Sequence, residues 1–225
     1  MKNQSENNEN QLPSPLRPTG VRLKVCGMNL NTMAVAKLQP QYLGFIFWKP
    51  SKRFFQDAMP QLPDCIKKVG VFVDASIEKI VDKTTKYDLQ TVQLHGQENV
   101  GFCKSLKEKI KNIKIIKVFS ISENFNFEAL HPFEKVCDYY LFDTKGKLPG
   151  GNGRVFNWKV LKNYPSQKPY FLSGGIGLGH IESIKEFLSR PESKYCHAID
   201  VNSKFETAPG LKDIEKLRAF KEILL

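Results

Sequence analysis

Eight short apolar runs recur along the chain, and their regular spacing restricts the fold more than any other feature. They begin roughly 20–30 residues apart, and each has the length of a β-strand. Helix-like patterns fill several of the intervals, including the segment that starts with the cap residue Ser76 and the segments 99–110, 181–188 and 211–225. The interval after Val118 is rich in Asn, Phe and Pro and is less helical. The runs lie near residues 22–26, 42–47, 68–73, 90–94, 113–118, 138–142, 169–172 and 196–201.

Alternation of strands and helices predicts an α/β fold with a parallel sheet and helices outside it. Eight such units without a second domain favour a single (β/α)8 TIM barrel over an open sheet, and we expect it to span residues 21–225. Residues 1–20 are polar and Pro-rich, with too little apolar surface to offset the entropy of ordering, so we expect a disordered tail.

Composition narrows the class of protein. The five cysteines are scattered without CxxC spacing and the four histidines form no metal-ligand motif, so we expect free thiols, a reducing cytoplasm and no metal site. No apolar stretch is long enough to span a membrane, and the N-terminus has no signal-peptide core. The net charge of +11 is spread along the chain. A Lys-rich surface explains this charge better than a nucleic-acid partner does, and it also suits an anionic small molecule.

Several apolar runs end at a residue that can carry chemistry. In a (β/α)8 barrel the C-terminal ends of the strands meet at one face, where active sites are built. Alternation along the first run places Lys24 and Cys26 on the inside and Val25 toward the helices. The residues at these strand ends that we select as candidates are Lys24, Cys26, Asp143, Gly174, Gly175 and Asp200.

Cys26 and Asp143 are the candidate base and acid. A lone cysteine is usually a small buried hydrophobe, but Cys26 ends a strand beside a glycine and close to Lys24, whose charge would lower the thiol pKa. Asp143 could serve only as a turn or cap residue. The long Gly-rich, basic segment 144–154 that follows it resembles a lid, under which desolvation would favour a protonated acid.

Other segments are typical of ligand contacts. The run 173–179 follows a strand and precedes a helix, which suits a barrel phosphate site at Gly174 and Gly175 better than a dinucleotide fold. Arg53 follows the second strand, where it is either solvated or positioned to bind a carboxylate. Gln93 and His95 share one face of the fourth strand, as an interior polar pair or as substrate contacts.

These residues together resemble the phosphoribosylanthranilate isomerase family over residues 21–225. The order and spacing of the motifs carry the resemblance, which rests on Lys24-Val25-Cys26-Gly27, Gly44-Phe45-Ile46-Phe47 with Ser51-Lys52-Arg53, Val69-Gly70-Val71-Phe72-Val73, Gln93-Leu94-His95-Gly96, Phe142-Asp143-Thr144 with Gly150-Gly151-Asn152-Gly153, Ser173-Gly174-Gly175-Ile176, and Asp200-Val201 through Glu206 to Pro209-Gly210.

The resemblance implies a (β/α)8 barrel and an Amadori rearrangement in tryptophan biosynthesis that uses no cofactor. It makes Cys26 the general base and Asp143 the general acid. It places Arg53 at the anthranilate carboxylate, and Gly174 and Gly175, together with Ser203, at the phosphate. The remaining candidates for substrate contacts are Lys24, Gln93, His95 and Asp200.

Three positions depart from the family pattern. Lys204 replaces a glycine near the phosphate site, Trp48-Lys49-Pro50 reorders the segment before Arg53, and Asn157 replaces an acidic residue at a helix start, where Asn still caps well. None of these changes removes the acid, the base or the arginine.

Two other functions are consistent with a phosphate-binding barrel. The related histidine-pathway isomerase uses aspartates at the ends of strands one and five, but the run 115–120 contains none. A non-catalytic phosphate- or nucleic-acid-binding barrel would not need Cys26 and Asp143. We therefore expect a phosphorylated small-molecule substrate, no nucleic-acid or membrane partner, and a monomer or homodimer.

Overall fold

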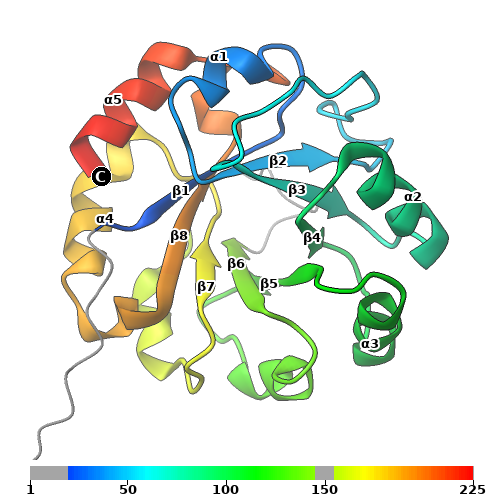
Figure 1. Ribbon diagram of the computed structural model, residues 1–225. Coiled ribbons are helices and arrows are strands. Elements are labelled where there is room, and N and C mark those ends of the chain that lie inside the picture. Colours follow the sequence, from blue (N-terminus) through cyan, green and yellow to red (C-terminus); the bar gives the residue numbers. More distant parts are fainter. Residues whose placement is uncertain (1–19, 145–154, 225) are drawn as a thin grey trace, which may run out of the picture.

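Eight parallel strands close into a barrel in sequence order, from β1 next to β2 around to β8 next to β1 (Figure 1). This arrangement comes from a computed structural model, which describes residues 20–144 and 155–224. The predicted TIM barrel is therefore confirmed. The strands are β1 (Arg22–Cys26), β2 (Tyr42–Ile46), β3 (Lys67–Phe72), β4 (Thr91–Leu94), β5 (Lys114–Ile121), β6 (Tyr139–Thr144), β7 (Tyr170–Leu172) and β8 (Cys196–Val201).

Helices surround the barrel (Figure 1). The α-helices are α1 (Thr32–Ala36), α2 (Ile77–Tyr87), α3 (Val100–Lys109), α4 (Ile181–Leu188) and α5 (Ile214–Leu224). Short 3-10 helices supplement them, namely η1 (Phe127–Phe133), η2 (Trp158–Asn163), η3 (Leu178–His180), η4 (Pro191–Tyr195) and η5 (Ser203–Phe205). Among the described residues, no helix is both long and apolar enough to cross a membrane.

Local signals explain where several helices begin. The side chains of Ser76 and Asn99 accept hydrogen bonds from backbone N–H groups of α2 and α3, at 3.3 and 2.9 Å. Asn157 does the same for η2, at 3.1 Å, so this departure from the family pattern keeps its capping role. Each cap satisfies a donor that the first helical turn leaves unpaired.

The last predicted helix, over residues 211–225, begins later than expected. Leu211–Lys212 forms a short strand, β10, which pairs with β9 (Glu206–Ala208) in an antiparallel hairpin, and α5 starts only at Ile214. The predicted disordered tail lies outside the described residues except for Gly20. Of the predicted lid, only Thr144 lies within them.

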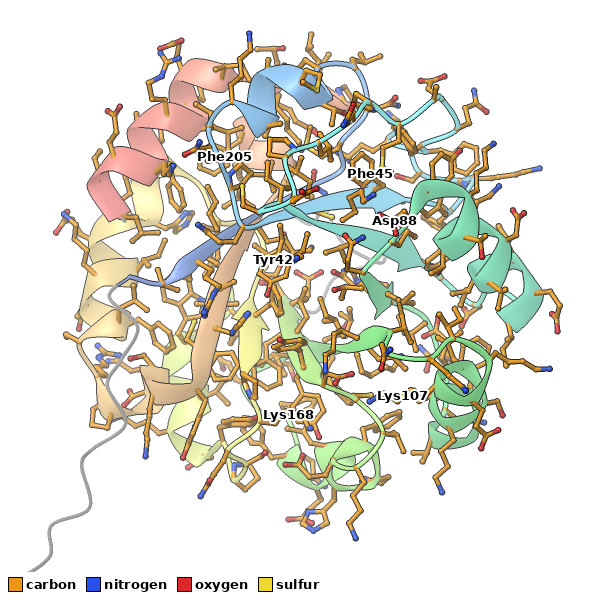
Figure 2. The ribbon with its side chains drawn as sticks, viewed as in Figure 1. Tyr42, Phe45, Asp88, Lys107, Lys168 and Phe205 are labelled. Atoms are coloured by element: carbon orange, nitrogen blue, oxygen red, sulfur yellow. The ribbon has the colours of Figure 1, made fainter. Side chains whose placement is uncertain are left out.

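The apolar side chains form an inner and an outer layer. Residues such as Tyr42 and Phe171 fill the barrel itself, with ring centroids 5.2 Å apart in an edge-to-face contact. Phe45 and Phe205 pack outside the barrel wall, against the helices (Figure 2). Because neighbouring residues of a strand face opposite layers, both layers are built from the same eight apolar runs.

A polar cluster closes the N-terminal end of the barrel interior. The Tyr42 hydroxyl lies 2.8 Å from Nε2 of His197, and Nη1 of Arg22 lies 3.3 Å from its Nδ1. The His197 ring also packs against Tyr139 and Phe171. Burial, reinforced by the nearby charge of Arg22, lowers the pKa of His197 to about 4. The imidazole is therefore neutral in the folded protein at pH 7.

Candidate active site

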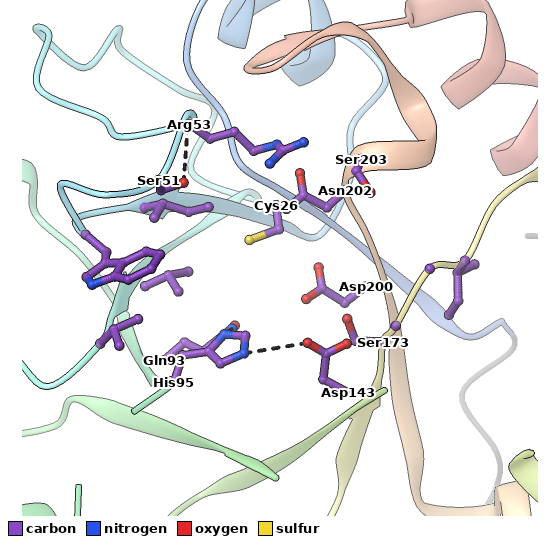
Figure 3. Close-up of a pocket in the computed structure, with 17 residues that line it drawn as sticks. Cys26, Ser51, Arg53, Gln93, His95, Asp143, Ser173, Asp200, Asn202 and Ser203 are labelled. Carbon is purple, nitrogen blue, oxygen red and sulfur yellow. Dashed lines mark hydrogen bonds and ion pairs between the residues drawn. The ribbon is translucent and has the colours of Figure 1, made fainter. Parts of the chain in front are cut away.

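A cavity opens among the C-terminal ends of the strands (Figure 3). Nine of the ten predicted site residues line it, since only Lys24 is missing from the lining within the described part of the chain. Eight strands that converge on one rim explain how residues distant in sequence come together. The predicted residues of the lining are Cys26, Arg53, Gln93, His95, Asp143, Gly174, Gly175, Asp200 and Ser203.

Cys26 ends β1 and points its thiol into the cavity (Figure 3). Its neighbour on β2 is Gly44, where an added Cβ would lie 2.8 Å from the Cys26 Sγ. A side chain at this position would therefore displace the sulfur. The small residue in the neighbouring strand leaves the space that the thiol needs.

The electrostatics at Cys26 differ from the sequence-based expectation. Lys24 does act to lower the thiol pKa, but burial has a larger effect in the opposite direction, and Asp200 adds to it. The net result is a pKa above the ordinary value. The Cys26 thiol is thus mainly protonated at neutral pH.

Asp143 ends β6 with its two carboxylate oxygens in different roles. Oδ1 accepts a hydrogen bond from the backbone N–H of Thr144 at 2.9 Å, which orients the group. Oδ2 lies 3.6 Å from Nε2 of His95, the contact drawn as a dashed line in Figure 3. His95 is itself 3.4 Å from the Gln93 amide, so these three side chains form one polar wall of the cavity.

Asp200 and Lys24 form a buried ion pair at 2.7 Å between β8 and β1. Lys24 is fully buried below the cavity floor, so the structure places it against Asp200 and not in the cavity lining. Asp200 does line the cavity, and its Oδ1 has no hydrogen-bond partner among residues 20–144 and 155–224. Burial raises the pKa of the Asp200 carboxyl, while Lys24 opposes that shift.

The loop after β7 forms a tight glycine turn. Gly174 and Gly175 have φ angles of 98° and 65°, a region that favours glycine. An added Cβ at Gly174 would lie 2.2 Å from Oγ1 of Thr144, so the turn packs directly on the end of β6. The turn and Ser203, at the start of η5, line the same cavity. Together they form a rim suited to bind a phosphate through backbone and hydroxyl groups.

Lys204 does not disrupt this rim. It is exposed, and its Cβ lies 3.0 Å from the position that a Cβ would take at Gly177. The lysine stem therefore packs over a second glycine, while its neighbour Ser203 stays in the cavity.

Arg53 reaches the cavity from the segment after β2. Its guanidinium is bound by Glu206, with Nε 2.9 Å from both carboxylate oxygens and Nη2 2.6 Å from Oε2. Glu206 therefore engages the guanidinium from inside the protein, and the contact of Arg53 with a substrate carboxylate stays a prediction. Sequence reasoning missed Glu206 as a functional residue, and it also missed Asn202 and Trp48, which line the cavity.

Comparison with known proteins identifies the family. Residues 23–222 match the family model described as N-(5'phosphoribosyl)anthranilate (PRA) isomerase. The chain belongs to this family. A relative from Parabacteroides distasonis, named N-(5'-phosphoribosyl)anthranilate isomerase, is 40% identical over 90% of this chain and 93% of its own length. The expected family resemblance is confirmed.

Solved structures of PRA isomerases have the same architecture. The Thermotoga maritima enzyme aligns with a TM-score of 0.76 and 28% identity, over 91% of this chain and 98% of that one. A second PRA isomerase structure, in complex with reduced 1-(o-carboxyphenylamino)-1-deoxyribulose 5-phosphate, aligns with a TM-score of 0.72 and 27% identity over the same shares of the two chains. The ligand of that second structure carries both a phosphate and a carboxyphenyl group.

Proposed function

We propose that this chain catalyses the Amadori rearrangement of N-(5'-phosphoribosyl)anthranilate to 1-(2-carboxyphenylamino)-1-deoxyribulose 5-phosphate in tryptophan biosynthesis. One observation carries the proposal: a thiol from β1 and a carboxylate from β6 share a cavity with a glycine turn and an arginine. This arrangement supplies a base, an acid, a phosphate rim and a cation for a carboxylate. Family membership supports the same conclusion.

Asp143 acts as the general acid. Its Oδ1 is held by the backbone, so Oδ2 is the oxygen positioned to deliver a proton into the cavity. Protonation of the ribose ring oxygen lets the ring C1–O bond break, and the nitrogen lone pair forms the iminium. His95 lies 3.6 Å from Oδ2, so its ring borders the oxygen that delivers the proton.

Cys26 acts as the general base. Its thiolate removes the proton from C2 of the iminium, which gives an enolamine that tautomerises to the ketone. Because burial raises the thiol pKa, we expect kcat/KM to increase with pH as the thiolate fraction grows. Asp143 gives one proton to the ring oxygen and Cys26 takes one from C2, while C1 is reduced and C2 is oxidised within the substrate. The reaction therefore balances without an external oxidant or reductant, which suits the expectation that no cofactor takes part.

The ends of the substrate bind at separate parts of the rim. Gly174, Gly175 and Ser203 receive the phosphate, and Arg53 receives the anthranilate carboxylate. Asp200 lines the cavity between them and contacts the sugar hydroxyls, while its Oδ1, unpartnered within the described part of the chain, is a buried atom. Gln93 and His95 complete the contacts on the β4 side.

Turnover of freshly generated phosphoribosylanthranilate, followed by the loss of its anthranilate fluorescence, tests the proposal. We expect Cys26→Ala and Asp143→Asn each to lose activity by a factor of about 100 or more. Cys65→Ala and Asp88→Asn are the matched controls, because both side chains are exposed and outside the cavity lining. An inactive but folded wild-type protein would exclude the isomerase function, and activity retained in Cys26→Ala would require a different base.

A cytoplasmic location and a monomer or homodimer complete the proposal. The five cysteine thiols are free in the described structure, as expected for a reducing compartment. Sedimentation velocity on the purified chain measures the oligomeric state directly.

A further inference from the structure

Three charged side chains form a cluster beside the cavity, and only Arg53 belongs to the cavity lining. Glu206 and Lys212 come from the β9–β10 hairpin that follows β8. Their side chains are 4% and 0% exposed, whereas that of Arg53 is 19% exposed. Buried charges are retained only where they are paired, so this cluster is a built feature and not a solvated surface.

Glu206 connects the two cations. Its Oε1 accepts from Nζ of Lys212 at 2.7 Å, and both of its oxygens accept from Arg53. Burial favours the protonated form of Glu206, yet Arg53 and Lys212 outweigh that effect and hold its pKa below the ordinary value. Glu206 is therefore a carboxylate that faces two positive charges.

Lys212 is held by oxygen acceptors on the cavity side as well. Besides Glu206, its Nζ lies 2.8 Å from Oδ1 and 3.4 Å from the backbone oxygen of Asn202, a residue of the cavity lining. Asn202 and the stem of Arg53 both press on Gly27, where an added Cβ would lie 2.6 Å from Asn202 Oδ1 and 2.7 Å from Arg53 Cδ. The contacts of the cluster therefore hold the Arg53 side chain in one position.

The charges of the cluster do not cancel. Two cations face one carboxylate, so the net charge is +1, whereas an Arg53–Glu206 pair alone would be neutral. Glu206 contacts Nε and Nη2 of Arg53, and Nη1 is the guanidinium nitrogen that it does not contact. A single additional carboxylate makes the cluster neutral.

We propose that Glu206 and Lys212 are positioning residues that orient Arg53 and leave it one uncompensated positive charge for the anthranilate carboxylate. The inference rests on the proposed function, because it assumes that this carboxylate binds at Arg53. Lys212 acts through Arg53 and Glu206 without touching the substrate.

Binding of two product analogues to the intact protein tests the proposal. One is the reduced 1-(o-carboxyphenylamino)-1-deoxyribulose 5-phosphate, and the other is the same molecule without its carboxylate. In the wild type we expect the carboxylated analogue to bind about 10- to 100-fold more tightly, the range of a hydrogen bond to a charged group. The affinity ratio is the affinity for the carboxylated analogue divided by that for the analogue without the carboxylate. Lys212→Met should reduce this ratio to about 1–3, because the remaining Arg53–Glu206 pair is neutral.

Two further variants separate charge from structure. Lys52→Met removes the same charge from an exposed position next to Arg53, so we expect it to keep the wild-type ratio. The double variant Lys212→Met with Glu206→Gln removes one charge of each sign and returns the net charge to +1. Glutamine keeps one acceptor oxygen that still orients Arg53, so we expect the preference for the carboxylated analogue to recover to within about threefold of the wild type. The double variant also serves as the test if Lys212→Met alone fails to fold.

The outcomes distinguish this inference from the proposed function. The inference is overturned if Lys212→Met weakens the binding of both analogues equally, because the role of Lys212 is then purely structural. It is also overturned if the affinity ratio of the double variant stays near 1. Arg53→Met tests the proposed function itself. If this variant keeps the wild-type affinity ratio, the carboxylate does not bind at Arg53 and the proposed binding mode fails. If Arg53→Met abolishes the ratio and Lys212→Met does not, only the present inference fails.

Discussion

Substitution of Lys24 by methionine tests how the floor of the site is held together. Lys24 and Asp200 are 2.7 Å apart, with side chains 0% and 5% exposed. Methionine fills a similar volume but leaves the Asp200 carboxylate buried without its cation. Breaking a buried pair in this way costs about 3–5 kcal/mol, so we expect that loss in the free energy of unfolding at pH 8.

The pH dependence identifies the cause of this loss. Burial already raises the pKa of Asp200 above its unfolded-state value, and removal of Lys24 raises it further. A group whose pKa is raised by folding stabilises the protein at low pH and loses that contribution as the pH rises. The deficit of Lys24→Met should therefore shrink by about 1 kcal/mol or more between pH 8 and pH 5.5.

Urea unfolding at both pH values measures the effect. Lys68→Met is the matched control, because its partner Asp88 is 85% exposed and such a pair contributes at most about 1 kcal/mol. A double variant, Lys24→Met with Asp200→Leu, should regain most of the lost stability, since no buried charge remains. A pH-independent deficit, or a double variant no more stable than Lys24→Met, would refute the reasoning.

Three other variants probe the barrel. Gly44→Ala places a Cβ 2.8 Å from the Cys26 sulfur, so we expect kcat to fall about tenfold or more without unfolding, whereas Gly179→Ala, with nothing within 4 Å, should be silent in the same fluorescence assay. Folding lowers the pKa of His197 to about 4, so the free energy of unfolding measured in urea should fall by about 2–3 kcal/mol between pH 7 and pH 4.5, where the unfolded chain binds the proton. His197→Gln should flatten that pH dependence. Lys117 on β5 forms a 2.8 Å ion pair with Glu98 and donates a 2.7 Å hydrogen bond to the backbone oxygen of Gly96, both in the loop after β4. Lys117→Met removes both contacts, so we expect a lower kcat and a thermal unfolding midpoint several degrees below that of the wild type. An unchanged midpoint would show that the pair is dispensable.

Strand ends are the part of the site that sequence predicts well. Alternating burial and a run of apolar residues place Cys26, Asp143 and Asp200 at the rim, because a parallel barrel brings every strand end to one face. Lys24 shows the limit of that reasoning. It shares a face with Cys26 but lies two residues earlier, about 6.6 Å back along the strand, which puts it under the cavity floor.

Loop partners and burial are the parts that sequence does not predict. Glu206 and Lys212 approach Arg53 because a short hairpin turns back over the rim, and no periodic pattern marks such a turn. The effect of Lys24 on Cys26 has the predicted sign, but its outcome depends on how deeply the thiol is buried. That balance is a property of the assembled cavity.

The pairing of β1 with β8 has a consequence for synthesis on the ribosome. Lys24 and Asp200 are 176 residues apart in the chain, and β1 has one open edge until β8 pairs with it. A nascent chain that lacks β8 therefore presents a lysine with no counter-charge and an unprotected strand edge. We expect the barrel to close in one late cooperative step, and fragments that end before β8 should aggregate or be degraded instead of forming stable partial barrels.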